Sequence, residues 1–170
     1  LTQFDAIITG VRAYNTEEWL VHHHDKLMNF VKEGGNMIVQ YSKSYNLFTE
    51  EIGPYPFEIS RKRVTMEEAP VRMLDKEHAL LNKPNDITQS DFRNWVQERG
   101  LYFADSWDDN YQPLLSSRDK NEDPLKGGLL FADYGKGAFM YTGYAFFRQM
   151  PAGVPGAYRL FTSMIEYEKQ

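Results

Sequence analysis

The chain has 170 residues, of which 42% are hydrophobic and 25% charged, and its formal net charge is −5. This size fits one compact domain, and the composition excludes an intrinsically disordered chain. No apolar run reaches the roughly 18 residues of a transmembrane helix. The acidic net charge argues against a nucleic-acid partner. The absence of cysteine excludes disulfides, thiolate zinc sites and a cysteine nucleophile.

The first 41 residues have the pattern of a strand–helix–strand unit. The nearly all-apolar run from Phe4 to Val11 predicts a strand buried on both faces, as in a parallel sheet. A helix is expected from Thr16 to Glu33, ended by Gly34 and Gly35. The apolar face of this helix recurs at spacings of 4, 3 and 4, at Leu20, His24, Leu27 and Val31. Met37 to Tyr41 predicts a second strand, parallel to the first.

The middle of the chain is less regular, and several short elements are expected there. A helix capped by Thr88 or Ser90 should bury Phe92, Trp95 and Val96 and end at Gly100. Asp105 to Asp109 are expected to form an acidic loop around Trp107. The other predictions are strands at Val71–Leu74, Leu101–Phe103 and Gln112–Leu115, and one helical turn at His78–Leu81.

The last part of the chain has clearer signals. Gly128–Tyr134 and Ala138–Tyr144 predict two strands of a β-hairpin, because the glycines between them suit a tight turn with positive φ. A rigid Pro/Gly linker over residues 151–156 precedes a final amphipathic helix, Ala157–Tyr167. With no internal repeat, the whole chain, residues 1–170, is expected to form a single α/β domain.

Several segments resemble a known family. They are Phe4-Asp5-Ala6-Ile7-Ile8-Thr9-Gly10-Val11-Arg12-Ala13-Tyr14-Asn15, Trp95-Val96-Gln97-Glu98-Arg99-Gly100-Leu101-Tyr102-Phe103, Pro113-Leu114-Leu115-Ser116, Tyr141-Thr142-Gly143-Tyr144 and Pro151-Ala152-Gly153-Val154-Pro155-Gly156-Ala157-Tyr158-Arg159. These resemble the C-terminal region of large bacterial proteins whose N-terminal half is a PIG-L (LmbE-like) deacetylase. That region is similar to ThuA-like proteins and to class I glutamine amidotransferases.

The resemblance implies a fold, a context and a location. The fold is a flavodoxin-like three-layer α/β sandwich of the amidotransferase type, with an antiparallel hairpin extension. The family normally supplies a strand–helix–strand unit before Leu1, so the chain is expected to be a piece of a longer protein. A periplasmic or extracellular location follows from the family, with a cytoplasmic one as the alternative.

Two departures from the family patterns concern catalysis. Amidotransferases place a Cys on a tight turn after a buried strand, whereas here Ser42, Lys43 and Ser44 follow the strand. ThuA-like proteins often carry a His after the hairpin strand, whereas here Gly143 is followed by Tyr144. No catalytic residue and no cofactor is therefore assigned.

A ligand site is expected at the carboxyl edge of the parallel sheet, where open α/β sheets bind ligands. Arg12, Tyr14 and Asn15 follow the first strand, and Tyr41 and Ser42 follow the second. These side chains could hold a carboxylate or a sugar, or they could serve only as loop hydrogen bonders and packing groups.

Other candidate ligand contacts are separate from that edge in the sequence. Trp107 with Asp108 has the aromatic-plus-carboxylate character of a sugar contact, although an anchored surface loop explains the pair equally well. Arg148, near the Pro/Gly linker, could serve an interface or tie the last helix to the sheet. No metal site is expected, because His22, His23 and His24 point about 100° apart on a helix.

The function predicted from these features is that of a non-catalytic accessory domain, which binds carbohydrate or the deacetylase domain of the same protein. One alternative is a hydrolase or amidotransferase-like enzyme with a nucleophile other than Cys, for which Ser42 is the candidate. The other alternative is a structural or oligomerisation module. Loss of an upstream strand would leave an open sheet edge, so self-association is also expected.

Overall fold

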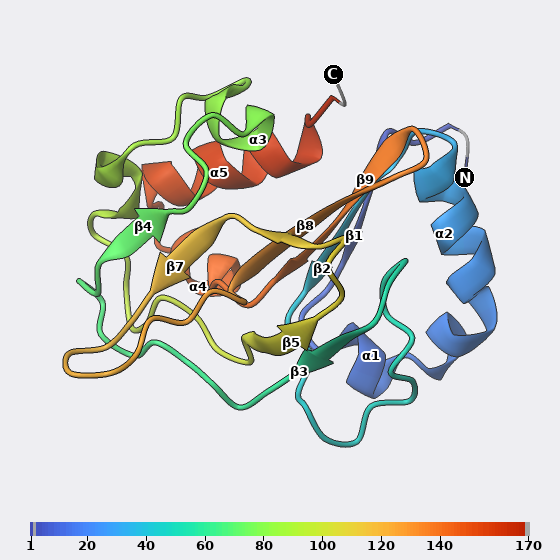
Figure 1. Cartoon of the computed structure of the whole chain (residues 1–170), viewed down its shortest axis with the longest axis horizontal. Helices are drawn as coiled ribbons and strands as arrows, with labels where there is room; N and C mark the ends of the chain where they lie inside the picture. The colour runs from blue at the N-terminus through green and yellow to red at the C-terminus, as the bar shows by residue number, and fades with distance from the viewer. Residues whose placement is uncertain (2, 169–170) are drawn as a thin grey trace.

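The computed structural model describes residue 1 and residues 3–168, and it is built around a mixed sheet of five strands (Figure 1). In spatial order the strands are β1 (Ala6–Thr9), β2 (Asn36–Gln40), β9 (Gly137–Thr142), β8 (Leu129–Tyr134) and β6 (Gln112–Pro113). The strands β1, β2 and β9 are parallel, whereas β8 runs antiparallel to β9 and β6 antiparallel to β8. The expected α/β class and the parallel pairing of the first two strands are confirmed.

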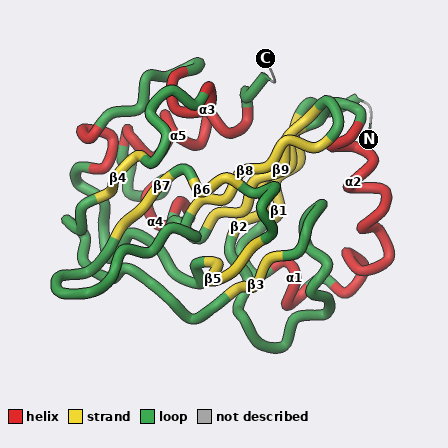
Figure 2. The backbone as a smooth tube through the Cα atoms, viewed as in Figure 1, coloured by secondary structure: helices red, strands yellow, loops and turns green. Residues whose placement is uncertain are grey.

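The remaining elements surround this sheet, and loops make up much of the chain between β2 and β8 (Figure 2). The helices are α1 (Ala13–Thr16), α2 (His24–Lys32), α3 (Ala79–Asn82), α4 (Phe146–Gln149) and α5 (Pro155–Ile165), with 3-10 helices η1 (Glu18–His23) and η2 (Gln89–Phe92). Two antiparallel ribbons complete the fold, β3 (Phe57–Ile59) with β5 (Ala104–Trp107) and β4 (Val71–Met73) with β7 (Leu115–Ser117). No helix of the described residues is long and apolar enough to cross a bilayer.

Both faces of the central sheet are buried, each against its own layer. Alternate residues of a strand point to opposite faces, and so Ile38 of β2 joins the core that contains Leu160 and Met164 of α5. Its neighbour Val39 joins the core that contains Val31 of α2. The helices α2 and α5 therefore lie on opposite sides of the sheet, as Figure 1 shows.

The predicted hairpin is confirmed over six residue pairs, from Leu129 with Thr142 to Tyr134 with Gly137. The turn requires glycine at position 135, where φ is +61° and a Cβ atom would lie 2.4 Å from the carbonyl oxygen of Lys32. The N–H of Lys136 donates to that same carbonyl at 2.9 Å. The hairpin tip is thus tied to the end of α2.

The predicted single helix from Thr16 to Glu33 is wrong, because the segment divides into α1, η1 and α2. The break lies at Glu17, whose φ of −111° and ψ of 82° are not helical. Thr16 ends α1 instead of capping a long helix. The apolar residues of the predicted helix nevertheless face the interior, since Leu20, Leu27 and Val31 are all buried in one core.

The predicted helix ending at Gly100 is also wrong. Thr88 is the cap, one of the two residues expected, and forms a capping box with Asp91, but the helical segment η2 stops at Phe92. Asn94 and Gln97 then take left-handed φ values of 59° and 67°, which interrupt any helix. The interruption brings Glu98 into the interior, where two arginines meet it.

Strand predictions in the middle of the chain are partly confirmed. Val71–Met73 is β4, and Ala79–Asn82 is α3 with His78 as its N-cap. Residues 112–115 divide between β6 and β7, which belong to different sheets. The predicted strand at 101–103 is wrong, because Tyr102 adopts a φ of 53°. The predicted acidic loop is wrong in its first half, where residues 104–107 form β5.

The first strand is not buried on both faces as predicted. Strand β1 lies at the edge of the sheet with β2 as its neighbour, and the side chain of Ile8 is 42% exposed. Phe4, just before the strand, is 51% exposed. On the sheet face that carries Ile8, the helix α5 packs against β2, the strand next to β1. The final helix is α5, which begins at Pro155, two residues before its predicted start.

Candidate functional site

The carboxyl ends of β1 and β2 bring Arg12 and Tyr41 together, as predicted. The N–H of Arg12 donates to the carbonyl oxygen of Tyr41 at 2.7 Å, and the guanidinium carbon lies 6.0 Å from the centre of the Tyr41 ring. The ring of Tyr41 stacks on the ring of Tyr102, with 5.6 Å between the ring centres, and packs against Phe147, with 5.4 Å between the centres. Tyr41 itself is buried, so it forms the floor of this edge while Arg12 is exposed above it.

A second group of cations lies beside this floor, around Tyr45. The ammonium nitrogen of Lys43 and the guanidinium carbon of Arg61 each lie 4.8 Å from the centre of the Tyr45 ring. Both distances are within the range of a cation–π interaction. The hydroxyl of Tyr102 also lies close enough to Tyr45 for the two phenols to interact. We refer to Arg12, Lys43, Tyr45, Arg61 and Tyr102 as the carboxyl-edge cluster.

The phenol of Tyr102 is the polar centre of the carboxyl-edge cluster. Burial raises its pKa, and the neighbouring Tyr45 phenol raises it further, while Arg61 and Arg12 act in the opposite direction. Because the net shift is upward, the hydroxyl keeps its proton at neutral pH and can donate it in a hydrogen bond. The two nearby guanidinium groups supply positive charge beside this donor.

Backbone strain coincides with the carboxyl-edge cluster. Arg12 and Tyr102 both adopt left-handed conformations, with φ of 62° and 53°. Each such residue costs on the order of 1–3 kcal/mol when it is not glycine, and such residues concentrate at binding sites and active sites. The fold therefore holds these two side chains in place against their local preference.

Asn15 positions the loop that carries Lys43 and Tyr45. Its amide nitrogen donates to the carbonyl oxygens of Lys43, Tyr45 and Asn46 at 3.0–3.2 Å, and its amide oxygen accepts from the N–H of Lys43 at 2.7 Å. The sequence hypothesis of a loop hydrogen bonder thus describes Asn15 better than that of a ligand contact.

Tyr14 and Ser42 are too deeply buried to touch a ligand in this structure. Tyr14 is 1% exposed, and its hydroxyl donates to the carbonyl oxygen of Ile52 at 3.3 Å. Burial raises its pKa well above the ordinary value for tyrosine. Ser42 is fully buried, and its Oγ has no hydrogen-bond partner among the described residues. The packing explanation considered for Tyr14 is the one that fits.

Among the described residues, no side chain forms with Ser42 Oγ the hydrogen bond that a general base would make. His78 packs instead between Phe131 and Tyr167, with ring centres 4.5 Å and 6.0 Å away. The Nδ1–H of His23 donates to the carbonyl oxygen of Trp19 at 2.8 Å. Within residues 1 and 3–168, no group of three or more metal-ligating side chains is placed to hold an ion.

Trp107 and Asp108 lie on the β3–β5 ribbon. Trp107 pairs with Phe57 across the ribbon and packs, partly buried, against the core on the α2 side. The N–H of Asp108 donates to the carbonyl oxygen of Pro56, and its carboxylate accepts from the backbone and side chain of Asn110. These contacts match the anchored-loop explanation. Trp107 packs against the core, and the carboxylate of Asp108 accepts hydrogen bonds within the turn that follows it.

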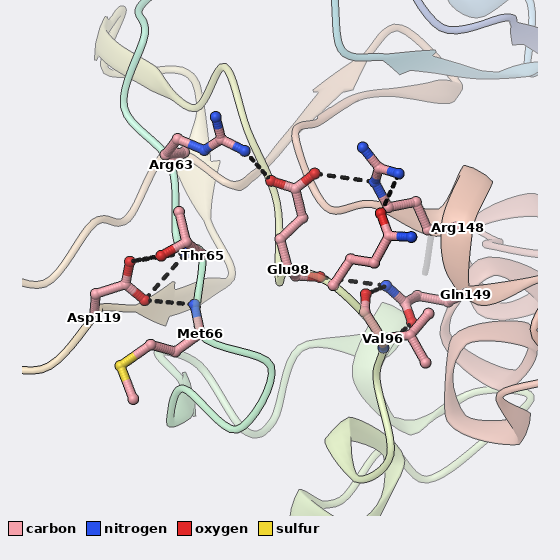
Figure 3. Close-up of polar contacts among 9 residues, drawn as sticks. Arg63, Thr65, Met66, Val96, Glu98, Asp119, Arg148 and Gln149 are labelled. Atoms are coloured by element: carbon pink, nitrogen blue, oxygen red, sulfur yellow. Dashed lines mark hydrogen bonds and ion pairs between the residues drawn. The ribbon is translucent and has the colours of Figure 1, made fainter.

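Arg148 forms an ion pair with a buried carboxylate, that of Glu98 (Figure 3). Its Nε lies 3.0 Å from Glu98, whose other oxygen is 2.5 Å from Arg63. Glu98 is 3% exposed. The guanidinium of Arg148 also lies 4.9 Å from the centre of Phe147, the ring that packs on Tyr41. Arg148 therefore supports the floor of the carboxyl edge rather than offering a free cation.

The loop around Arg63 is fastened by a second carboxylate, shown in Figure 3. Asp119 accepts hydrogen bonds from the N–H and hydroxyl of Thr65 and from the N–H of Met66, at 2.7–3.1 Å. Burial acts to raise the pKa of Asp119, but these hydrogen bonds prevail and the pKa lies below its usual range.

Two clefts lie away from the carboxyl-edge cluster. One, of about 930 Å³, opens at the amino edge of the sheet and is lined by residues that include Phe4, Phe30 and Tyr167. The other, of about 530 Å³, lies beside η2 and includes Trp95. Neither of these two clefts is lined by a residue of the carboxyl-edge cluster.

The sequence hypothesis missed Tyr45, Arg61 and Tyr102 as members of the site. Arg61 belongs to the polar run of residues 60–63, whose basic character was a usable signal. Tyr102 was assigned to a strand, and nothing local indicates its left-handed φ. Distant segments supply these residues, so only the fold brings them to Arg12.

Comparison with known proteins gives a fold and no family. No family model matches the chain, and no curated protein matches it. Similar solved structures include two cytoplasmic proteins of Salmonella typhimurium, both 15% identical, with TM-scores of 0.62 and 0.59. Each match covers 99% of this chain, and 73% and 74% respectively of the Salmonella proteins.

Part of a larger enzyme is also similar. The β-galactosidase of Rahnella sp. R3 matches with 14% identity and a TM-score of 0.52, over 94% of this chain. The β-galactosidase of Bacillus circulans sp. alkalophilus matches with 10% identity and a TM-score of 0.54, over 98% of this chain. The chain spans only 22% and 23% of these enzymes. At such identities the likeness concerns the fold alone.

Proposed function

We propose that the chain is a non-catalytic accessory domain that binds carbohydrate at the carboxyl edge of its sheet. The observation that carries the proposal is the carboxyl-edge cluster, in which Arg12, Lys43 and Arg61 surround the phenols of Tyr45 and Tyr102. Hydroxyl-rich ligands are bound by such groups, because guanidinium and phenol groups donate directed hydrogen bonds and aromatic rings offer apolar faces.

Binding is favoured over catalysis by the state of the candidate nucleophile. Ser42 is fully buried, and its Oγ lacks a partner among the described residues. A serine nucleophile needs a base within hydrogen-bond reach and access to substrate. The carboxyl-edge cluster supplies donors and positive charge, which hold a ligand.

Saturation-transfer NMR with a panel of monosaccharides tests the proposal. We expect transfer to at least one sugar, and loss of most of it in Tyr45→Ala. Tyr158→Ala is the matched control, because Tyr158 is 48% exposed on α5 and Tyr45 is 40% exposed. No transfer to any sugar, or equal loss in both variants, would contradict the proposal.

A second candidate function is docking of another polypeptide at the edge of the sheet. Strand β1 is an edge strand, and Ile8 and Phe4 are exposed beside it. An open strand edge with exposed apolar side chains favours pairing with a further strand. This observation supports the expected self-association and, equally, contact with a deacetylase domain of the same protein.

The proposed context is a larger PIG-L deacetylase-like protein, located in the periplasm or outside the cell, with the cytoplasm as the alternative. The finer fold proposed is the flavodoxin-like, amidotransferase-type sandwich, and the layers formed by α2 and α5 around the sheet support it. The two β-galactosidases offer a precedent for a domain of similar fold within a longer carbohydrate-active chain. Sequencing the reading frame before Leu1 tests this context directly.

A further inference from the structure

The carboxyl-edge cluster concentrates unpaired positive charge on an acidic chain. The chain has 24 acidic residues against 19 Lys and Arg. Lys62, Arg63, Arg148 and Arg159 each form an ion pair with a carboxylate. Within the described residues, Arg12, Lys43 and Arg61 have aromatic rings as neighbours and no carboxylate in ion-pair contact. Their charge is available to a ligand.

The aromatic rings also orient these cations. Arg12 lies over Tyr41, and both Lys43 and Arg61 lie over Tyr45. Cation–π contact restrains a long side chain and leaves the N–H groups at its rim free to donate. Less rotamer entropy is then lost when an anion binds.

Resting on the proposed carbohydrate function, we infer that the ligand is an acidic sugar, whose carboxylate binds between Arg12 and Arg61 beside the hydroxyl of Tyr102. Guanidinium groups match a planar carboxylate with two parallel hydrogen bonds. The remaining sugar hydroxyls would face Lys43 and Tyr45.

Titration calorimetry of the whole chain with glucuronate and with glucose tests the inference. We expect glucuronate to bind at least about tenfold more tightly than glucose, because charge-assisted hydrogen bonds are roughly twice as strong as neutral ones. Arg61→Gln and Arg12→Gln should each weaken glucuronate binding about tenfold and weaken glucose binding by a smaller factor, because only glucuronate loses a charge-assisted pair. Arg72→Gln, an exposed arginine on β4, is the matched control and should change neither.

The remaining results separate the two proposals. Equal affinity for glucuronate and glucose, with no effect of Arg12→Gln or Arg61→Gln, would overturn the acidic-sugar inference and leave carbohydrate binding intact. Acetate or inorganic phosphate binding as tightly as glucuronate would show a simple anion site and also overturn it. No binding of either sugar would overturn both proposals.

Discussion

The hydroxyl of Tyr141 donates a hydrogen bond of 2.6 Å to the backbone carbonyl of Tyr102. The backbone of Ser42 lies beside the same hydroxyl and acts to lower the pKa of Tyr141. One buried phenol on β9 therefore joins the residue that follows β2 to the strained residue at the centre of the carboxyl-edge cluster. Burial raises the pKa of Tyr141 far above its ordinary value, so the donor keeps its proton.

Replacing Tyr141 by Phe should destabilise the protein by about 1–3 kcal/mol, because the carbonyl of Tyr102 loses its partner. Urea unfolding measures this loss. Tyr144→Phe is the control, since the hydroxyl of Tyr144 makes a longer bond of 3.4 Å to Ser117 and should matter less. Sugar binding should weaken in Tyr141→Phe only. Equal stability losses in the two variants would contradict the assignment.

Replacing Glu98 by Ala should also be damaging, with a loss on the order of 1–3 kcal/mol, because the arginines it leaves behind are a third or more exposed. The carboxylate is buried, and its removal leaves Arg148, which is partly buried, without its ion-pair partner. Arg63→Ala should cost less than about 1 kcal/mol, because the Arg63 side chain is 53% exposed. Thermal unfolding of both variants checks the order. A smaller effect of Glu98→Ala than of Arg63→Ala would be inconsistent with the structure.

Stability should fall as the pH drops below about 6.5. Burial lowers the pKa of His78 below its usual value of 6.5, although Asp75 and Asp133 act in the opposite direction. A His with a lowered pKa binds protons more readily when unfolded, so its contribution is complete above 6.5 and declines toward the folded-state pKa. Urea unfolding between pH about 7.5 and 5.5 measures the slope.

His78→Asn is the comparison for that slope. Asparagine retains an acceptor for the N–H of Leu80, which His78 caps at 3.2 Å, and removes the titrating group. A slope unchanged in this variant would exclude His78 as its source. The lowered pKa of Asp119 acts in a separate range, since its contribution is lost only as the pH falls below about 3.8.

The isolated chain should associate through β1, and Ile8→Lys should shift it toward monomer. A charge on an exposed edge strand opposes pairing with another strand. Because Ile8 is 42% exposed, the substitution should change the free energy of unfolding little. Light scattering over a range of concentrations gives the mass. Monodisperse monomer for the original chain at high concentration would contradict the expectation.

Local signals in the sequence were sufficient for the parallel β1–β2 pair, the β8–β9 hairpin and the last helix. Each depends on neighbouring residues: an apolar run, glycines at a turn, or apolar spacing on one face. They also placed Arg12 and Tyr41 at one edge of the sheet, because parallel strands end on the same side. The contact between them, 6.0 Å from guanidinium to ring, agrees with that placement.

Tertiary structure alone decided the rest of the candidate site. Tyr102 and Arg61 come from segments with no regular secondary structure, and a φ of 53° at a tyrosine is imposed by packing and by its bond to Tyr141. In place of the helix expected up to Gly100, the chain buries Glu98 against two arginines from distant segments, and local helix propensity cannot indicate such contacts. Propensity amounts to less than about 1 kcal/mol per residue, whereas an unpaired buried charge costs several.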